Sequence, residues 1–188
     1  MTVPVLWDKK SKTIVNKESG DIIRILDSAF DAWGDASARF YPDDLAADIE
    51  AMNARILPKV CMGVYKCGFA GEQAAYDDAV GELFTTLDEL DARLSAQPYL
   101  LGGRITESDW HLFMTLVRFD AVYHTRLKCT VRRLTDYPNL SRYTRRLFDL
   151  PGVADTIKLD HVKMHYFDGL GIGNPRIIPA DPSRDFRH

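Results

Sequence analysis

The sequence has little cysteine, and what it has forms no recognisable motif. Only three cysteines occur in 188 residues, Cys61, Cys67 and Cys129, and no two of them are spaced as Cys-x-x-Cys. An odd number at irregular spacing argues against a disulfide framework, and the missing motif excludes a zinc knuckle and a two-cysteine redox site. We therefore expect three reduced, mostly buried thiols in a cytoplasmic protein.

Long apolar runs, a secretory signal and a basic surplus are also missing. Charged residues interrupt every apolar run before it reaches the ~18 residues of a membrane helix. Residues 1–10 contain no apolar signal core. The net charge is −3, whereas proteins that bind phosphate backbones normally carry a basic excess. We expect neither a membrane nor a nucleic acid as a partner.

The sequence has the composition of a globular chain: 46% of its residues are hydrophobic and 27% are charged. Val3–Trp7 and the β-branched Thr13–Val15 are separated by a polar turn, which predicts a hairpin. Apolar residues recur at helical spacing over 22–30, after the cap residues 16–19. Two strands and one helix are marginal alone, so we expect the beginning of this unit to be missing.

From residue 45 onward the pattern is helical. Leu45, Ile49, Met52, Ile56 and Val60 share one face of a long helix. A proline at position 58 should kink or interrupt that helix, because proline lacks the amide hydrogen. A second helix is predicted over 72–94.

A third helix is predicted to begin at Thr106, where Asp109 completes a variant of the capping box. It is apolar nearly all round as far as Phe119, which is typical of the central helix of a bundle. Further helices are predicted over 137–150 and from 151 to about 165.

Two short sites near the beginning of the chain could bind a ligand. A cis bond at Val3-Pro4 would expose backbone groups to a peptide-like ligand, although the residues alone favour an ordinary trans proline. Glu18 and Ser19 stand at a helix N-terminus, where a carboxylate and an ammonium group could both be bound. A plain helix cap is the simpler interpretation of that pair.

The helical region offers weaker candidates. Tyr65, Tyr123 and Tyr166 are distributed over three predicted helices, and tyrosines in a bundle usually pack in the core with one satisfied hydroxyl. His161 and His165 could share a helix face, but no third ligand follows the pattern of a metal site. We therefore expect no metal.

Several strings together point to one family. They resemble, in the same order, the glutathionyl-hydroquinone reductases, which are the Xi-class, omega-like glutathione transferases, and the likeness covers essentially the whole chain. The strings are Val3–Asp8, Gly63–Lys66, Leu116–Asp120, Lys128-Cys129, Asp136–Leu140, Pro151–Val153, His165–Phe167 and Asn174–Pro179.

The resemblance implies a mainly α fold, in which a partial thioredoxin-like β-β-α unit precedes a glutathione transferase C-terminal helical bundle. The implied segments are 1–33, 41–168 and an extended tail over 169–188. The implied activity is the reduction of glutathionyl-hydroquinones to hydroquinones, with glutathione as co-substrate. A homodimer is also implied, and it would cover the exposed edge of the hairpin.

The same resemblance assigns roles to individual residues. The backbone of Val3, before a cis Pro4, would pair with the cysteinyl part of glutathione. Glu18 and Ser19 would bind its γ-glutamyl head. Two tyrosines, Tyr65 and Tyr166, would line the quinone pocket and hydrogen-bond the quinone oxygens.

One departure from the family is large. The nucleophilic cysteine of these enzymes lies in a Cys-Pro-Trp-Ala motif, and no cysteine of this sequence is followed by proline. We therefore expect the piece of the enzyme given by these 188 residues to contain no catalytic nucleophile and to be inactive alone. Two other interpretations stay open: a non-catalytic helical interaction module, and a module that binds quinones without reaction.

Overall fold

The computed structural model describes residues 3–169 and residue 186, so most of the predicted tail, 169–188, lies outside the described residues. The chain divides into two compact units, 1–47 and 48–188, and each is described by itself. The finer division into 1–33, 41–168 and 169–188 stays a prediction.

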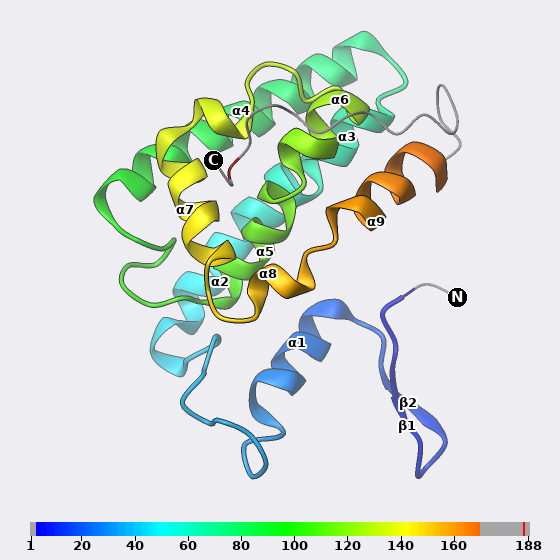
Figure 1. The fold of residues 1–188 in the computed structure, drawn as a ribbon, viewed down its shortest axis with the longest axis vertical. Coiled ribbons are helices and arrows are strands. Elements are labelled where there is room, and N and C mark those ends of the chain that lie inside the picture. Colours follow the sequence, from blue (N-terminus) through cyan, green and yellow to red (C-terminus); the bar gives the residue numbers. More distant parts are fainter. Residues whose placement is uncertain (1–2, 170–185, 187–188) are drawn as a thin grey trace. The chain divides into compact units, whose positions relative to one another are not determined.

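The first unit is a hairpin followed by a helix (Figure 1). Strands β1 (Leu6–Asp8) and β2 (Thr13–Asn16) pair antiparallel, and α1 covers Ser19–Ser28. In the turn between the strands, the Asp8 carboxylate accepts the Lys10 amide at 2.8 Å. The predicted hairpin and helix are confirmed. The first strand begins at Leu6 rather than Val3, and the proline at position 4 has no amide with which to join a strand ladder.

The helical region holds eight helices within the described residues, and α3 and α7 both pack against α4 (Figure 1). None of the described helices combines the length and the hydropathy that a membrane span needs. The helices are α2 (Ala46–Ile56), α3 (Gly63–Phe69), α4 (Gln73–Ala96), α5 (Glu107–Leu116), α6 (His124–Arg126), α7 (Pro138–Phe148), α8 (Val153–Thr156) and α9 (Leu159–Met164).

Pro58 interrupts the first long helix, as predicted. Helix α2 ends at Ile56, a π-helical segment covers Leu57–Cys61, and α3 begins at Gly63. The wider turn accommodates the missing amide hydrogen of the proline. The break also starts α3 as a separate helix, and α3 carries Tyr65 and Cys67.

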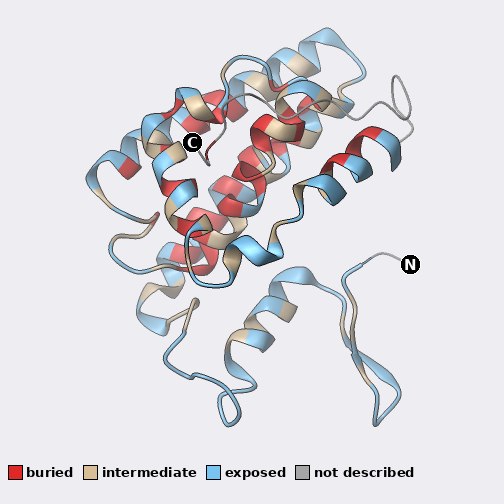
Figure 2. Ribbon diagram, viewed as in Figure 1, coloured by how far each residue is buried: buried red, intermediate tan, exposed pale blue. Residues whose placement is uncertain are grey.

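Helix α5 is the buried centre of the second unit. Its capping box is present, and the Thr106 amide donates to the Asp109 carboxylate at 2.8 Å. Leu112, Phe113 and Leu116 are at most 1% exposed. Figure 2 shows buried residues concentrated in the helices of this unit. The helix ends at Leu116, earlier than predicted, and a π-helical segment then covers Phe119–Tyr123.

The single helix predicted from 151 to about 165 is wrong. The structure has two short helices, α8 and α9, separated by Ile157 and Lys158. Ile157 adopts an extended conformation, which its β-branched side chain favours. Just before it, the hydroxyl of Thr156 donates to the Val153 carbonyl at 2.7 Å and so competes for the helical backbone.

Candidate functional site

Three tyrosine hydroxyls meet inside the second unit. Tyr65 lies on α3, Tyr123 ends the π-helical segment after α5, and Tyr166 lies in the π-helical segment His165–Gly169 after α9. The Tyr166 hydroxyl is hydrogen-bonded to that of Tyr65 and lies 3.2 Å from that of Tyr123. The ring centroids of each pair lie between 5.5 and 6.5 Å apart. We call these residues the tyrosine cluster.

The proton count of the tyrosine cluster leaves one donor for a ligand. Each hydroxyl carries one hydrogen and can also accept. Two hydrogen bonds join the three hydroxyls, and they use two of the three hydrogens, whichever oxygen donates. The third hydrogen can therefore point to an oxygen of a bound molecule.

The surroundings of two hydroxyls of the tyrosine cluster make them weaker acids than a free phenol. Burial raises the pKa of Tyr166 to about 12. Burial and the hydrogen bonds within the cluster also raise the pKa of Tyr123. These two hydroxyls are thus protonated at neutral pH and act as neutral hydrogen-bond donors rather than as bases.

Two neighbours position the tyrosine cluster, and sequence reasoning missed both. The Arg126 guanidinium donates from Nε to the Tyr166 carbonyl at 2.8 Å, and its centre lies 5.8 Å from the ring centroid of Phe167. Phe69 stacks on Tyr65 with centroids 6.3 Å apart. Arg126 lies among other polar residues and belongs to no recognisable motif, so the sequence carries no signal of its role. The helical spacing of Leu116, Phe119 and Tyr123 could have indicated that Tyr123 points inward.

The glutathione residues implied by the resemblance lie in the first unit. Glu18 is the N-cap of α1 and Ser19 is its first residue, and both are exposed. The Glu18 amide donates to Asn16 at 2.7 Å, which fixes the approach to the helix. The Val3-Pro4 bond is cis, which the residues alone did not favour and the resemblance implied. Val3 is 91% exposed.

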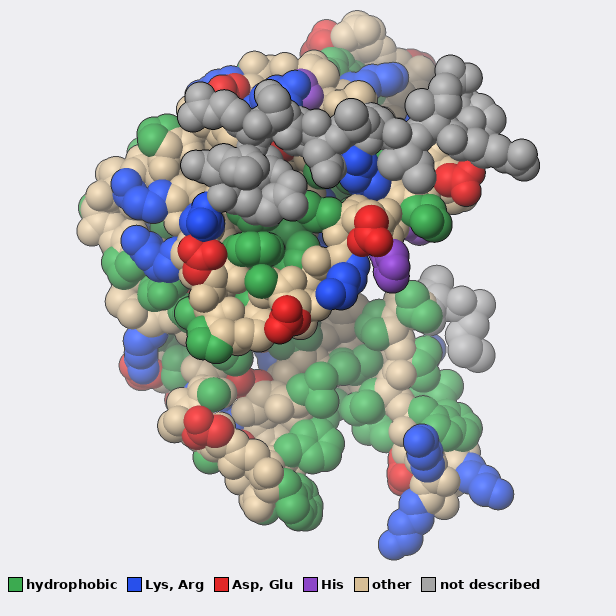
Figure 3. All heavy atoms as spheres, in the orientation of Figure 1, with side chains coloured by type: hydrophobic (Ala, Val, Ile, Leu, Met, Phe, Trp, Pro, Cys, Tyr) green, Lys and Arg blue, Asp and Glu red, His purple; other side chains and the backbone are tan. Residues whose placement is uncertain are grey.

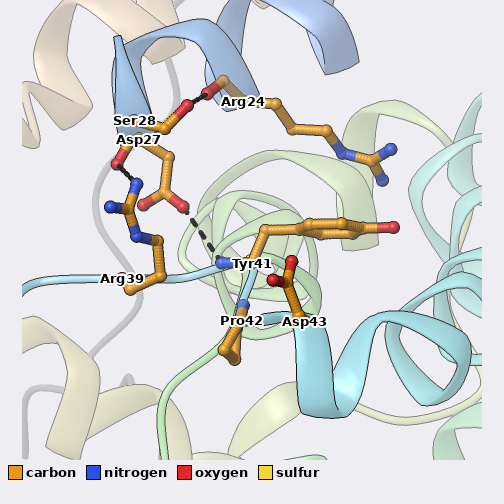
Figure 4. A pocket seen from close by; sticks show the side chains of 7 residues that line it. All are labelled: Arg24, Asp27, Ser28, Arg39, Tyr41, Pro42 and Asp43. Carbon is orange, nitrogen blue, oxygen red and sulfur yellow. Dashed lines mark hydrogen bonds between the residues drawn. The ribbon is translucent and has the colours of Figure 1, made fainter. Parts of the chain in front are cut away.

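A cavity of about 510 Å³ also lies in the first unit, beside the end of α1 (Figure 4). The Arg24 guanidinium lies over the Tyr41 ring, 4.0 Å from its centroid. Arg39 donates to the Asp27 carbonyl at 2.7 Å and pairs with Asp31 at 2.5 Å.

The Asp27 carboxylate beside this cavity stabilises the local fold. The two oxygens of Asp27 accept the backbone amides of Phe40 and Tyr41 at 2.9 and 3.1 Å. Figure 4 shows this carboxylate turned toward the chain that follows α1. These hydrogen bonds attach residues 39–41 to α1, so the groups around the cavity are engaged with one another and we assign it no ligand.

The two histidines do not form a metal site with other ligands in the part of the chain that the structure describes. His161 lies on α9 and His165 begins the next segment. Residues 3–169 and 186 contain no group of three His, Cys, Asp or Glu side chains that could hold a metal ion. The His165 ring instead lies edge-on to Tyr166, with centroids 5.1 Å apart.

Comparison with known proteins agrees with this fold. Residues 73–146 match the family model of the glutathione S-transferase C-terminal domain. Glutathionyl-hydroquinone reductase PcpF from Sphingobium chlorophenolicum is 47% identical to this chain over 98% of the chain and 59% of its own length. Glutathionyl-hydroquinone reductase YqjG from Escherichia coli is 46% identical over 98% of the chain and 57% of its own length.

Solved structures show the same likeness. The glutathione-bound structure of YqjG matches with a TM-score of 0.95 and 45% identity, covering 100% of this chain and 61% of that one. The Xi-class glutathione transferase from Natrialba magadii matches with a TM-score of 0.94 and 42% identity, covering 100% of this chain and 57% of that one. The chain therefore spans about three fifths of the length of these relatives.

Fold and sequence together define the class: this chain has the glutathione transferase fold, and residues 73–146 match the C-terminal domain of that superfamily. The proteins that it resembles over nearly all of its own residues include glutathionyl-hydroquinone reductases and Xi-class transferases.

Proposed function

We propose that this chain takes part in the glutathione-dependent reduction of glutathionyl-hydroquinones to hydroquinones. Two relatives that it matches over 98% of its length carry that name. The observation that carries the proposal within the molecule is the tyrosine cluster, in which Tyr166 joins Tyr65 and Tyr123 through their hydroxyls.

The chemistry of the tyrosine cluster suits a hydroquinone. A hydroquinone has two ring oxygens that accept and donate hydrogen bonds, and an aromatic face that packs against other rings. The cluster offers one unused hydroxyl hydrogen and aromatic surfaces from Tyr65 and Phe69. We propose Tyr65 and Tyr166 as the residues that bind the hydroquinone oxygens, with Tyr123 and Arg126 positioning Tyr166.

Glutathione is the proposed co-substrate. Its γ-glutamyl head carries a carboxylate and an ammonium group. The exposed N-terminus of α1 can bind the carboxylate through its amides and Ser19, and Glu18 can pair with the ammonium group. The backbone of Val3, beside Pro4, is proposed to bind the cysteinyl part.

The bond-breaking step needs a thiolate outside these groups. In the proposed reaction a cysteine thiolate attacks the glutathione sulfur, the S–S bond forms as the C–S bond to the ring breaks, and the ring carbon takes up a proton so that the hydroquinone leaves. A second glutathione then attacks the mixed disulfide, which releases glutathione disulfide and the cysteine thiol. Cys61, Cys67 and Cys129 are followed by Met, Gly and Thr, unlike the family motif. We propose that the 188-residue chain, assayed alone, shows no cysteine-dependent turnover.

Two measurements on the isolated chain test these proposals separately. With a glutathionyl-hydroquinone and glutathione, hydroquinone release should not exceed the uncatalysed rate, and robust turnover would contradict the inactivity. Titration calorimetry with the same hydroquinone should detect binding. Tyr166→Phe should weaken that binding about fivefold, the worth of one hydrogen bond of ~1 kcal/mol.

Tyr99→Phe is the matched control, because Tyr99 lies in the loop after α4 and outside the tyrosine cluster. It should leave the affinity unchanged. Equal affinities of all three proteins would contradict the role of the cluster.

A module that binds quinones without reaction is the second candidate. It is favoured by one observation: the hydroxyls of the tyrosine cluster all belong to the second unit, so they need no residue of the first unit to meet. If the chain binds hydroquinone but glutathione does not bind at all, this candidate is preferred over the reductase.

We also propose a homodimer in the cytoplasm. The three cysteines are free thiols, and β1 and β2 form a two-stranded sheet whose edges offer backbone groups for pairing. Light scattering after gel filtration should give twice the chain mass. A monomeric mass at micromolar concentration would contradict the dimer.

A further inference from the structure

Two of the three cysteines meet in space, although they lie far apart in the sequence. Cys67 lies in the last turn of α3, and Cys129 follows α6. The two thiols interact, because each shifts the pKa of the other. The Cys129 sulfur also lies 4.0 Å from the carbonyl of Val64, one turn before Cys67 on the same helix.

The backbones that carry the two thiols approach closely. A Cβ added at Gly68 would lie 2.9 Å from the Cβ of Leu127, so only glycine allows this approach. Lys128 has a φ of 57°, a left-handed conformation that turns the chain just before Cys129. The hydroxyl of Tyr76 donates to the Lys128 carbonyl at 2.7 Å and holds this turn against α4.

A small molecule can reach one of the two thiols. Cys67 and Cys129 are 1% and 0% exposed, but Cys67 lines a cavity of about 470 Å³. The cavity lining also includes Glu72, Lys128 and Thr130, which are exposed, so the cavity is at the surface. An oxidant of a few atoms fits this approach better than a bulky disulfide.

The two thiols are not equivalent. A hydrogen bond from Cys129, together with the charge of Lys66, lowers the pKa of Cys67. The same hydrogen bond and burial raise the pKa of Cys129. Cys67 also lines the cavity, so it is both the accessible thiol and the better nucleophile, because the thiolate is the reactive form.

We propose that Cys67 and Cys129 are a redox-active dithiol, which a small hydroperoxide oxidises to an intramolecular disulfide. The Cys67 thiolate attacks one peroxide oxygen, the O–O bond breaks, and Cys67 becomes a sulfenic acid while hydroxide leaves. The sulfur of Cys129 then attacks the Cys67 sulfur, the S–O bond breaks and water leaves. In total, two thiols and one hydrogen peroxide give one disulfide and two water molecules.

This dithiol is independent of the proposed reductase activity. It uses no residue of the tyrosine cluster, and its product is a covalent bond between α3 and the segment after α6. Cys61 serves as the internal control for thiol reactivity. Its thiol donates to the carbonyl of His111 at 3.5 Å, and burial raises its pKa.

The experiment treats the reduced full chain with one equivalent of hydrogen peroxide, then labels it with N-ethylmaleimide in denaturant. Labels per chain should fall from three to one, and a peptide pair linked through Cys67 and Cys129 should appear and vanish with dithiothreitol. Cys61→Ser should form the same disulfide and retain no label. Three retained labels, or a disulfide through Cys61, would overturn the proposal.

A second pair of variants tests the order of the steps. In Cys129→Ser, Cys67 should stop at the sulfenic acid and be trapped by dimedone, whereas in Cys67→Ser the Cys129 thiol should stay unlabelled by dimedone. Circular dichroism shows whether each variant is folded. If neither variant folds, the linked peptide pair in wild type and in Cys61→Ser tests the proposal by itself. Dimedone on Cys129 rather than Cys67 would contradict the assigned roles.

Discussion

The two units of this chain contain similar kinds of side chains but use them differently. In residues 48–188, apolar side chains from α2 to α7 form a continuous core, with Leu112 at 0% exposure. In residues 3–47 no residue is buried, and Trp33 and Leu26 remain 83% and 57% exposed. Figure 3 shows hydrophobic side chains at the surface in the region of the hairpin and α1.

The difference shows which forces hold each unit. The second unit is stabilised by removal of apolar surface from water, which is the dominant favourable contribution to folding. The first unit relies on local hydrogen bonds, such as those of Asp8 in the turn and Asp27 beyond α1. Local hydrogen bonds are each worth only ~1 kcal/mol net, so we expect the two units to respond to mutation very differently.

The largest effect is expected in the core of α5. Leu112→Ala removes a side chain that is fully buried and should lower the free energy of unfolding by about 2–5 kcal/mol. Met114→Ala, on the same helix but 40% exposed, is the control and should change it by less than about 1 kcal/mol. Urea denaturation followed by circular dichroism measures both, and equal losses would mean that α5 is not the centre of the core.

The capping box gives the next effect. Asp109 accepts the amides of Thr106 and Leu100 and the hydroxyl of Tyr143 at 2.8 to 3.0 Å. Asp109→Asn leaves a buried donor without an acceptor and should cost about 1–3 kcal/mol. Asp136→Asn tests the same motif at an exposed position, where Asp136 accepts the Arg133 amide. This variant should lower the free energy of unfolding by less than Asp109→Asn does.

The stability lost in Asp109→Asn should also depend on pH. Burial raises the pKa of Asp109 in the folded protein above its unfolded value. The contribution of the bound proton to stability is therefore complete below the unfolded pKa and is lost as the pH rises through the folded pKa. The difference in unfolding free energy between wild type and variant should be larger at pH 4 than at pH 8. A difference that grows with pH would contradict this sign.

An effect of similar size is expected where α3 meets the segment that precedes Cys129. Gly68→Ala should destabilise the protein by about 1–3 kcal/mol, because the new methyl group would press on Leu127. Gly81→Ala, at a position on α4 with open space around the added Cβ, should instead stabilise by about 0.5–1 kcal/mol. Thermal melting compares the two, and stabilisation by both would show that α3 can move away.

The smallest effect is expected in the first unit. Leu26→Ala lies on α1 at a 57% exposed position and should shift the main unfolding transition by less than about 0.5 kcal/mol. The same unit should be the first to be cleaved in limited proteolysis, because residues 3–47 contribute no buried side chain. Early cleavage within α4 or α5 instead would mean that the second unit, and not the first, is the less stable of the two.

Local signals in the sequence were sufficient for much of the fold. Thr106 and Asp109 predicted the start of α5, and the missing amide of Pro58 predicted the break after α2, because capping and proline effects act within a few residues. The continuous helix from 151 to 165 was wrong, since the competition at Thr156 and Ile157 between helix and extended backbone is decided by a few tenths of a kcal/mol.

The candidate sites were less predictable. The family resemblance implies roles for Tyr65 and Tyr166, whereas the sequence indicates Tyr123 only as a tyrosine of the bundle and gives no role for Arg126. Their meeting depends on the packing of α3 against the segments that follow α5 and α9. No spacing along the chain reports that packing.

The sequence by itself determined the likeness to the glutathionyl-hydroquinone reductases, the places where the longer helices begin, and the position of Glu18 and Ser19 at the start of α1. Only the tertiary structure decided which hydroxyls of the tyrosine cluster are hydrogen-bonded to one another, and that Cys67 and Cys129 interact. The physical reason is that caps, turns and periodicity depend on neighbours a few residues away, whereas contacts between distant side chains depend on how whole helices pack together.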